Sequence, residues 1–186
     1  MRQSGILMHI TSLPGPHGVG TMGKPAKDFV DFLKAAGQSL WQILPLSPTG
    51  SGDSPYQSCS AYAGNHYLID LELLVEEGLL TREEVDSVTW CYNENRVDFG
   101  LLYQNRLNVL RKAYSRFWDW DALADFCRKN GDWLPDFTLF MALKEKFRGN
   151  AWQSWSISLM MRFPEVIADC RRELADTIQF HQFLQY

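Results

Sequence analysis

Two short apolar runs separated by one helix-length segment constrain the fold of this 186-residue chain most strongly. Residues 5–10 read GILMHI and residues 40–44 read LWQIL, and both runs are typical of short buried strands. Between them, Pro25 stands near the first position of a predicted helix, and Gly37 ends it. A strand, a helix and a strand in this order predict a βαβ unit, with two parallel strands and a right-handed crossover.

Each predicted strand is followed by a long loop. The first, residues 11–23, is rich in Gly and Pro, and we call it the glycine loop. The second, residues 45–66, has almost no formal charge, and we call it the tyrosine loop because Tyr56, Tyr62 and the adjoining Tyr67 make it too aromatic for a solvated linker. Flat rings cover the C–H faces of a sugar, and uncharged hydroxyl and amide groups bond to its O–H groups. The tyrosine loop therefore predicts a sugar-binding site.

The remainder of the chain is predicted to be mainly helical. Apolar spacing predicts helices over 101–117, 121–130 and 133–148, and a last helix from Pro164 to the final residue. We therefore divide the chain into residues 1–70, the βαβ unit with its two loops, and residues 71–186, a helical subdomain. The tryptophans in or beside these helices are predicted to be core residues rather than a ligand platform: Trp118, Trp120, Trp133, Trp152 and Trp155.

Two features indicate part of a larger protein. A sheet of two parallel strands is not expected to stand alone, because parallel sheets are normally covered on both faces. The last predicted helix also reaches Tyr186 without a stop signal. We expect the N-terminal piece of a larger α/β protein, and we expect marginal solubility because the two strands lack partner strands.

Composition excludes several classes of function. The net charge of −4 and the pI near 5.5 provide no electrostatic footprint for nucleic acid or an anionic membrane. No apolar run reaches the roughly 18 residues of a membrane span, and the N-terminus does not resemble a signal peptide. The cysteines lack zinc-site or C-x-x-C spacing, so free thiols in a cytoplasmic protein are expected: Cys59, Cys91, Cys127 and Cys170.

Residues 18–23 match the dinucleotide-binding pattern G-x-G-x-x-G. However, the first glycine lies far from the preceding strand, where the fingerprint requires a tight turn. No acidic residue occurs between Asp31 and Asp53 to bind a ribose. We therefore interpret the glycines as a plain connection above the end of a strand.

The usual catalytic constellations are absent or incomplete. Glycosidic-bond chemistry requires paired carboxylates, and the tyrosine loop contains only Asp53, in a position typical of a turn. The histidines have no metal-ligand spacing. A Ser-His-Asp triad stays open, although no G-x-S-x-G elbow occurs. We assign no catalytic residue and no metal site.

Several long segments closely resemble the start of the 4-α-glucanotransferases (amylomaltase or disproportionating enzyme family). These segments are HITSLPGPHGVGTMG, KPAKDFVDFLKAAG, WQILPLSPTGSGDSPYQSCSAYAGNHYLIDL, VDFGLLYQNRLNVLRKAY and WLPDFTLFMALKEKF, which together span most of the chain. The resemblance implies an α/β fold, namely the first two strands of a (β/α)8 TIM barrel with a largely helical insertion. Both loops would then lie on the rim that carries the active sites of such barrels.

The resemblance also implies a reaction. The family transfers α-1,4-glucan segments between maltodextrins through a covalent glycosyl-enzyme, which is the retaining two-carboxylate scheme with a sugar as acceptor. Its carboxylates come from later strands, and none matches a position in this chain. The implied partners are α-1,4-glucans such as maltooligosaccharides, starch or glycogen chains, with no metal or organic cofactor. The 186-residue chain alone is expected to be inactive.

The family's substrate-contacting positions carry over residue by residue. Ser54 and Tyr56 match residues that line the donor subsites, and Asp53 belongs to the same GDSPYQS motif. Asn65 matches an asparagine that helps to shape the loop. Tyr103 matches a tyrosine of an accessory glucan-binding surface in some members.

The chain departs from the family pattern at four positions of the loop. Ser51 stands where many members have an aromatic residue of the accessory surface, and His66 replaces a proline. Cys59 and Tyr62 replace phenylalanines. Two alternatives stay open, a non-catalytic α-glucan-binding module and a helical interaction module formed by residues 101–186.

Overall fold

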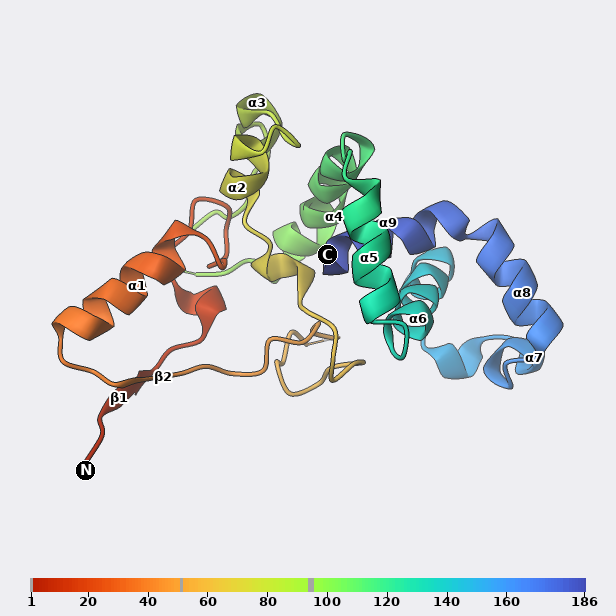
Figure 1. Ribbon diagram of the computed structural model, residues 1–186, viewed down its shortest axis with the longest axis horizontal. Helices are drawn as coiled ribbons and strands as arrows, with labels where there is room; N and C mark the ends of the chain where they lie inside the picture. Colours follow the sequence, from red (N-terminus) through yellow and green to blue (C-terminus); the bar gives the residue numbers. More distant parts are fainter. Residues whose placement is uncertain (1, 51, 94–95) are drawn as a thin grey trace. The chain divides into compact units, whose positions relative to one another are not determined.

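The computed structural model of the chain describes residues 2–50, 52–93 and 96–186 (Figure 1). The chain forms two compact units, Met1–Phe117 and Trp118–Tyr186. The first unit contains β1 (Gly5–Leu7), α1 (Lys24–Ala35), β2 (Leu40–Gln42), α2 (Leu71–Glu76), α3 (Arg82–Asp86) and α4 (Phe99–Ser115). The second contains α5 (Trp120–Lys129), α6 (Leu134–Lys146), α7 (Ile157–Met160), α8 (Pro164–Glu173) and α9 (Ala175–Gln185). Short 3-10 turns occur at Ile10–Ser12, His66–Leu68 and Trp152–Ser154.

The strands β1 and β2 pair in parallel, and α1 connects them (Figure 1). This confirms the predicted strand–helix–strand unit. Both strands are three residues long, so the predicted extents 5–10 and 40–44 were too long. Pairing ends after the Met8 amide donates to the Gln42 carbonyl at 3.0 Å, because the chain then turns into a 3-10 helix that buries Ile10.

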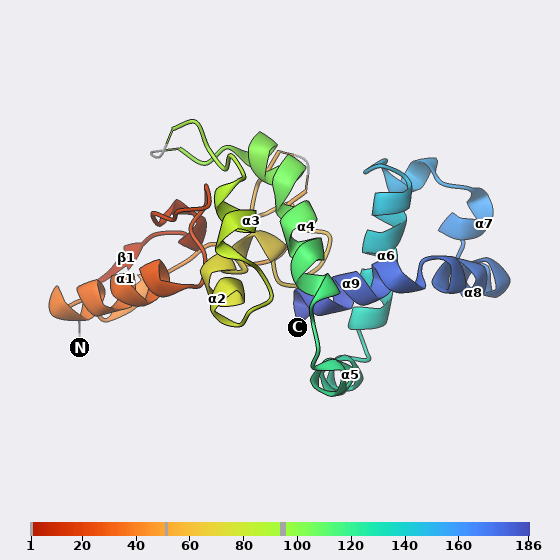
Figure 2. The same cartoon turned by 90° about the horizontal axis from the view of Figure 1, so that it is seen from above.

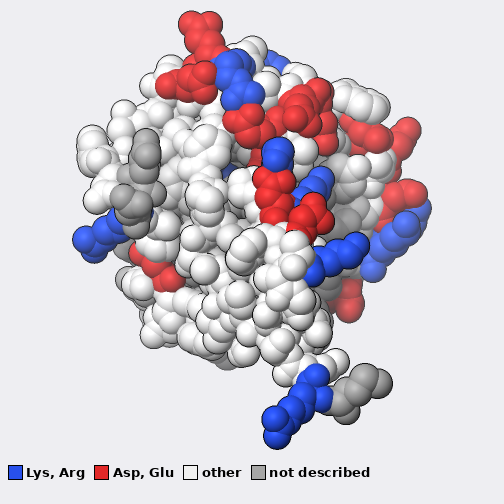
Figure 3. Space-filling view, turned by 90° about the vertical axis from the view of Figure 1, so that its left-hand side faces the viewer, with Lys and Arg blue, Asp and Glu red and all other residues white. Residues whose placement is uncertain are grey.

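The prediction that these strands are buried was wrong. Leu7 is 58% exposed and Leu40 is 52% exposed, because each strand has a single partner and the sheet is not covered by a second layer on every side. Figure 3 shows a broad area without charged side chains on this side of the molecule. The expectation of marginal solubility rests on this apolar exposure and stays a prediction.

The helix α1 forms where the sequence predicted it. Pro25 lies in its first turn, where the missing amide hydrogen costs nothing, and Gly37 follows it with a φ of +69°. Helix and sheet are joined by the ring of Trp41. Its ring packs edge-on against Phe29 at 5.0 Å between centroids, and its indole N–H donates to the Met8 carbonyl at 2.7 Å.

The helices α2, α3 and α4 complete the first unit, and α4 lies beside α2 and α3 (Figure 2). Each begins at a residue whose side chain accepts a hydrogen bond from the first turn, namely Asp70, Thr81 and Asp98. Arg116 joins α4 to α3 through Glu84, with N–O distances of 2.7 and 2.9 Å. The helix predicted over 101–117 is thus confirmed as α4, displaced by two residues.

The second unit is helical and has an apolar core. One cluster of this core contains buried residues of α6, α7, α8 and α9: Leu139, Ala142, Leu143, Leu159, Cys170 and Ile178. The helices predicted over 121–130 and 133–148 are confirmed as α5 and α6 within two residues. The single helix predicted from Pro164 was wrong, since the chain breaks at Leu174 (φ −102°, ψ 19°) and α8 and α9 run in different directions (Figure 1). The break allows Leu174 and the apolar residues of α9 to pack on the core.

The tryptophan prediction was partly wrong. Trp118, Trp120 and Trp152 are exposed, whereas Trp133 and Trp155 are half-buried. The exposed three lie before or at the start of a helix, where the large ring is not covered by neighbouring turns within this chain.

Candidate functional site

The tyrosine loop is ordered by hydrogen bonds within itself. At its base the Asn65 amide donates to the Leu46 carbonyl at 2.8 Å. Farther out, the Gly50 amide donates to the Gln57 carbonyl at 3.1 Å, which makes a short antiparallel ladder. A loop closed at its base and cross-linked near its tip presents a defined surface.

The serines of the tyrosine loop fold it locally without adding charge. The Ser54 Oγ accepts from the Tyr56 amide at 3.4 Å. The Ser60 Oγ accepts from the amides of Tyr62 and Ala63 at 3.2 and 3.1 Å. Serine side chains stabilise turns by such bonds, so these serines help to order the loop.

Asp53 lies in a tight turn at the tip of the loop. Its amide donates to the Gly50 carbonyl at 3.2 Å, and its φ of +55° is one that aspartate tolerates better than most residues. Gly52 before it also has a positive φ, of +93°. Ser51, whose departure from the family pattern bears on the accessory surface, lies outside the described residues.

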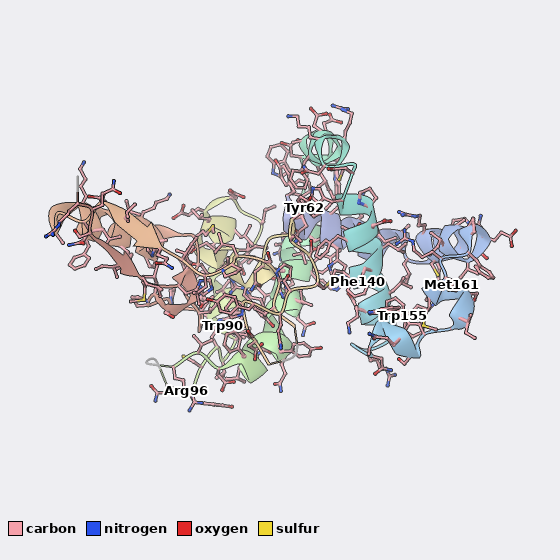
Figure 4. The ribbon with its side chains drawn as sticks, turned by 90° about the horizontal axis from the view of Figure 1, so that it is seen from below. Tyr62, Trp90, Arg96, Phe140, Trp155 and Met161 are labelled. Atoms are coloured by element: carbon pink, nitrogen blue, oxygen red, sulfur yellow. The ribbon has the colours of Figure 1, made fainter. Side chains whose placement is uncertain are left out.

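Two of the three predicted aromatic contacts are presented to solvent. Tyr56 and Tyr62 are each 73% exposed, and Ser54 beside them is half-buried (Figure 4 labels Tyr62). Tyr67 is 5% exposed, so the expectation that it faces a ligand was wrong. Burial raises the pKa of the Tyr67 phenol to about 12. The ring of Tyr67 belongs to the core beneath the loop.

Asn65 is buried and has a structural partner. Its side-chain oxygen accepts from the Tyr67 amide at 3.0 Å and caps the 3-10 turn that ends the tyrosine loop. Tyr103, by contrast, is exposed on α4. The predicted site residues therefore differ in position: Ser54, Tyr56 and Asp53 lie on the outer part of the loop, Asn65 lies at its base, and Tyr103 lies on a separate helix.

The glycine loop is bound tightly to the chain that follows the tyrosine loop. The Met22 amide donates to the Leu68 carbonyl at 3.1 Å, and the Thr21 hydroxyl donates to the Asp70 carboxylate. A Cβ added at Gly23 would lie 1.8 Å from an oxygen of Asp70. A Cβ at Gly20 would lie 2.0 Å from a backbone carbonyl oxygen. Close packing thus accounts for these glycines without a nucleotide.

A buried polar cluster lies beneath the two loops, around Trp90 (Figure 4). Arg106 from α4 has no exposed surface, and its guanidinium lies 5.6 Å from the centroid of Trp90. His17 from the glycine loop packs edge-on against the same ring at 5.8 Å, and its Nε2 lies 3.3 Å from Glu72. Burial lowers the pKa of His17 and also lowers that of Arg106, to about 10.

Sequence reasoning missed Arg106, although a signal was present. It lies four residues after Leu102 and four before Leu110, both fully buried, so it interrupts the apolar stripe of α4. A charged residue on such a stripe indicates a buried partner.

The exposed side chains of the tyrosine loop are groups that can bind a ligand. Among residues 2–50, 52–93 and 96–186, no three His, Cys, Asp or Glu side chains gather to hold a metal ion. The four cysteines are not joined by disulfides. Within the same ranges, no helix has both the length and the apolar character that a membrane crossing requires. A loop with two exposed tyrosines and few formal charges can stack on and hydrogen-bond to a neutral ligand.

The parallel pair of β1 and β2 with α1 between them defines an α/β arrangement, and the tyrosine loop at the carboxyl end of β2 is its candidate site. Residues 8–186 match the family model of the 4-alpha-glucanotransferases, and the chain belongs to this family. It is 45% identical over 181 residues to the 4-alpha-glucanotransferase of Clostridium butyricum, covering 96% of this chain and 37% of that protein. It is 44% identical to the 4-alpha-glucanotransferase of Thermus thermophilus, and this match covers 100% of this chain and 37% of that protein.

A solved structure supports the same relationship. The amylomaltase from Streptococcus agalactiae, in complex with acarbose, matches with a TM-score of 0.95 and 43% identity. The match covers 100% of this chain and 38% of that one. The chain therefore spans about 37% of the length of these curated relatives.

Proposed function

We propose that the chain is the N-terminal, glucan-contacting part of a 4-α-glucanotransferase that transfers α-1,4-glucan segments between maltodextrins. The observation that carries the proposal is the tyrosine loop, which is ordered, carries Asp53 as its one formal charge and exposes Tyr56 and Tyr62. The match to the Streptococcus agalactiae amylomaltase covers all of this chain, and that amylomaltase is in complex with acarbose. A neutral, hydroxyl-rich ligand fits this loop chemically.

The proposed roles follow from the positions of the side chains. The Tyr56 ring stacks on a sugar face, and the Ser54 hydroxyl and the Asp53 carboxylate bond to its O–H groups. Asn65 acts indirectly, by holding the base of the loop. Tyr103 contributes to an accessory glucan surface on α4.

The proposed fold places β1 and β2 as the first two strands of a (β/α)8 barrel. Further strands would cover the exposed apolar side chains of Leu7 and Leu40. The proposed mechanism is retaining, in which one carboxylate forms a covalent glycosyl-enzyme and another acts as acid and then base. In this proposal both carboxylates lie outside the 186 residues, and the intermediate is passed to a sugar 4-hydroxyl instead of water.

A chimera tests the proposal. In it, these 186 residues replace the matching segment of the Thermus thermophilus relative, which is 44% identical. We expect the chimera to convert maltotriose into glucose and longer maltodextrins, and the 186-residue chain alone to leave maltotriose unchanged. A folded chimera without transfer activity, or turnover by the chain alone, would contradict the proposal.

The site assignment is tested separately in the same chimera. Tyr56→Ala removes a stacking ring and a phenolic hydrogen bond, together worth about 1.4 kcal/mol, so kcat/KM should fall about tenfold. Tyr92→Ala is the matched control, because Tyr92 is also highly exposed but lies outside the tyrosine loop. Equal effects of the two substitutions would remove Tyr56 from the site while leaving the transferase proposal intact.

The second candidate is a glucan-binding module without catalysis. It is favoured by one observation, that the tyrosine loop is closed by hydrogen bonds within this chain. Titrating intrinsic fluorescence with maltoheptaose distinguishes the two candidates. Saturable binding by the chain together with an inactive chimera would favour the module.

A further inference from the structure

Arg106 is an unusual core residue because, among the described residues, its buried guanidinium forms no ion pair, although the charge of Asp70 acts on it from farther away. The side chain has no exposed surface, and within the described part of the chain no carboxylate oxygen lies within ion-pairing distance of its guanidinium. Its Nη2 donates to the Tyr67 carbonyl at 3.2 Å and to the Ile69 carbonyl, whereas its Nε and Nη1 have no partner. Burying a charge in this way is costly, and an apolar side chain would stabilise the core better.

The two carbonyls that Arg106 holds belong to one short segment, residues 65–70. The carbonyl between them, of Leu68, instead accepts from the Met22 amide of the glycine loop at 3.1 Å. Asp70 at the end of the segment accepts from the Thr21 hydroxyl. The 65–70 segment is therefore fixed on one side by α4 and on the other by the glycine loop.

The same segment carries the base of the tyrosine loop. Asn65, its first residue, donates its amide to the Leu46 carbonyl at 2.8 Å and closes that loop. Any displacement of residues 65–70 therefore moves the end of the loop that bears Tyr56 and Tyr62. Of the contacts described here for residues 65–70, those of Arg106 come from a long helix, whereas the others join one loop to another.

We propose that Arg106 is a positioning residue, which sets the place of the glucan-binding loop by holding the Tyr67 and Ile69 carbonyls. This inference rests on the proposed function of the tyrosine loop. Hydrogen bonds from a charged donor are stronger than neutral ones, and the planar guanidinium is oriented by the ring of Trp90 beneath it. A lysine keeps the charge but loses the planar fork and much of the stacking, so it should replace Arg106 only in part.

The test compares Arg106→Lys and Arg106→Met in the 186-residue chain by amide hydrogen exchange and by maltoheptaose affinity. We expect exchange at the Asn65 and Met22 amides to become at least tenfold faster in Arg106→Met and severalfold faster in Arg106→Lys, with affinity falling in the same order. Amides of the second unit, such as that of Leu143, should be unchanged.

Arg116→Lys is the matched control. Arg116 directly follows the last residue of α4 and also donates to a carbonyl, that of Leu79, but its guanidinium pairs with Glu84 of α3 and not with the 65–70 segment. We expect its substitution to leave the Asn65 exchange rate and the affinity within twofold of the original chain.

Three outcomes would overturn the proposal. The first is folded Arg106 variants with unchanged Asn65 exchange. The second is loosening without any loss of affinity in a chain that binds. The third is loss of protection throughout α4 in both variants, which would make Arg106 a general core residue. If the unsubstituted chain does not bind maltoheptaose, the assignment of the glucan site to this chain fails, whereas the exchange rates of Asn65 and Met22 still decide whether Arg106 positions the loop.

Discussion

The two units of the molecule are stabilised by different kinds of buried group. Among the described residues, the first unit buries five polar or charged side chains: His17, Thr21, Asn65, Asp70 and Arg106. The second unit buries two, Thr138 and His181, within an otherwise apolar core. The buried polar groups thus gather where the first unit holds its loops.

This difference teaches how a loop site and a helical scaffold are specified. Hydrogen bonds are directional, so the contacts of Asp70 and Arg106 define one position for the chain around them. Apolar packing is less directional and tolerates substitution if volume is kept. We therefore expect polar substitutions to affect the first unit most and cavity-forming ones to affect the second.

The largest effect is expected from a cavity in the second unit. Leu143→Ala removes a nearly fully buried side chain from the cluster formed by α6, α7, α8 and α9, so the free energy of unfolding should fall by about 3 kcal/mol. Urea denaturation followed by circular dichroism measures it. Ile157→Ala, at an exposed position in the same unit, should change it by less than about 0.5 kcal/mol. Similar costs at the two positions would contradict an apolar core here.

A smaller effect is expected where the glycine loop meets Asp70. Gly23→Ala puts a methyl group 1.8 Å from the Asp70 carboxylate, so one of them must move, at a cost of about 2 kcal/mol. Amide exchange at Met22 reports the displacement directly. Gly131→Ala is the control, because its Cβ would meet only ordinary contacts, at 3.4 Å or more. A Met22 amide that stays protected in Gly23→Ala would argue against this contact.

Removing one side-chain hydrogen bond should cost more stability in the first unit than in the second. Asn65→Ala leaves the buried Tyr67 amide without its acceptor, which should cost about 1 kcal/mol. Thr138→Val removes a hydroxyl that donates to the Leu134 carbonyl at 2.9 Å, but that carbonyl keeps its helical partner, so the cost should be within about 0.5 kcal/mol. Thermal unfolding of the two variants ranks them. A larger cost for Thr138→Val would reverse the comparison between the units.

The smallest effect concerns pH and is confined to the first unit. The bonds from Arg116 and from the Thr81 amide lower the pKa of Glu84 to about 2. A pKa lower in the folded state than in the unfolded chain stabilises the fold above the unfolded value near 4.5, and this contribution is lost as the pH falls from there toward 2. Glu84→Gln keeps the capping box and removes the charge, so its stability should fall less over that range. The measurement is the stability of each chain as a function of pH. An equal loss of stability in the original chain and in Glu84→Gln between pH 4.5 and 2 would contradict the assignment.

The sequence was most informative about helices, because their apolar period and end signals are local. It predicted α1, α4, α5 and α6 within two residues. It missed the break at Leu174, since no glycine or proline marks a turn that serves the packing of α9 on the core. The strands were predicted too long and buried, because burial depends on neighbours that a local pattern does not specify.

The residue types of the candidate site were predicted from the sequence, but the contacts that hold them in place were not. The uncharged tyrosine loop and the exposure of Tyr56 followed from residue types and the family resemblance. The inward position of Tyr67 and the role of Arg106 did not, since both depend on contacts between segments some 37 to 39 residues apart. The position of Arg106 on the apolar stripe of α4 indicated that its side chain is buried, but no local pattern indicated which distant segment it contacts.

The most direct test of the central claim is an NMR titration of the 15N-labelled chain with maltoheptaose. If the tyrosine loop binds the glucan, shift changes will be concentrated at the amides of residues 45–66, and Tyr56→Ala will reduce them while Tyr92→Ala will not. Shifts absent from that loop, or confined to Trp118–Tyr186, would contradict the account.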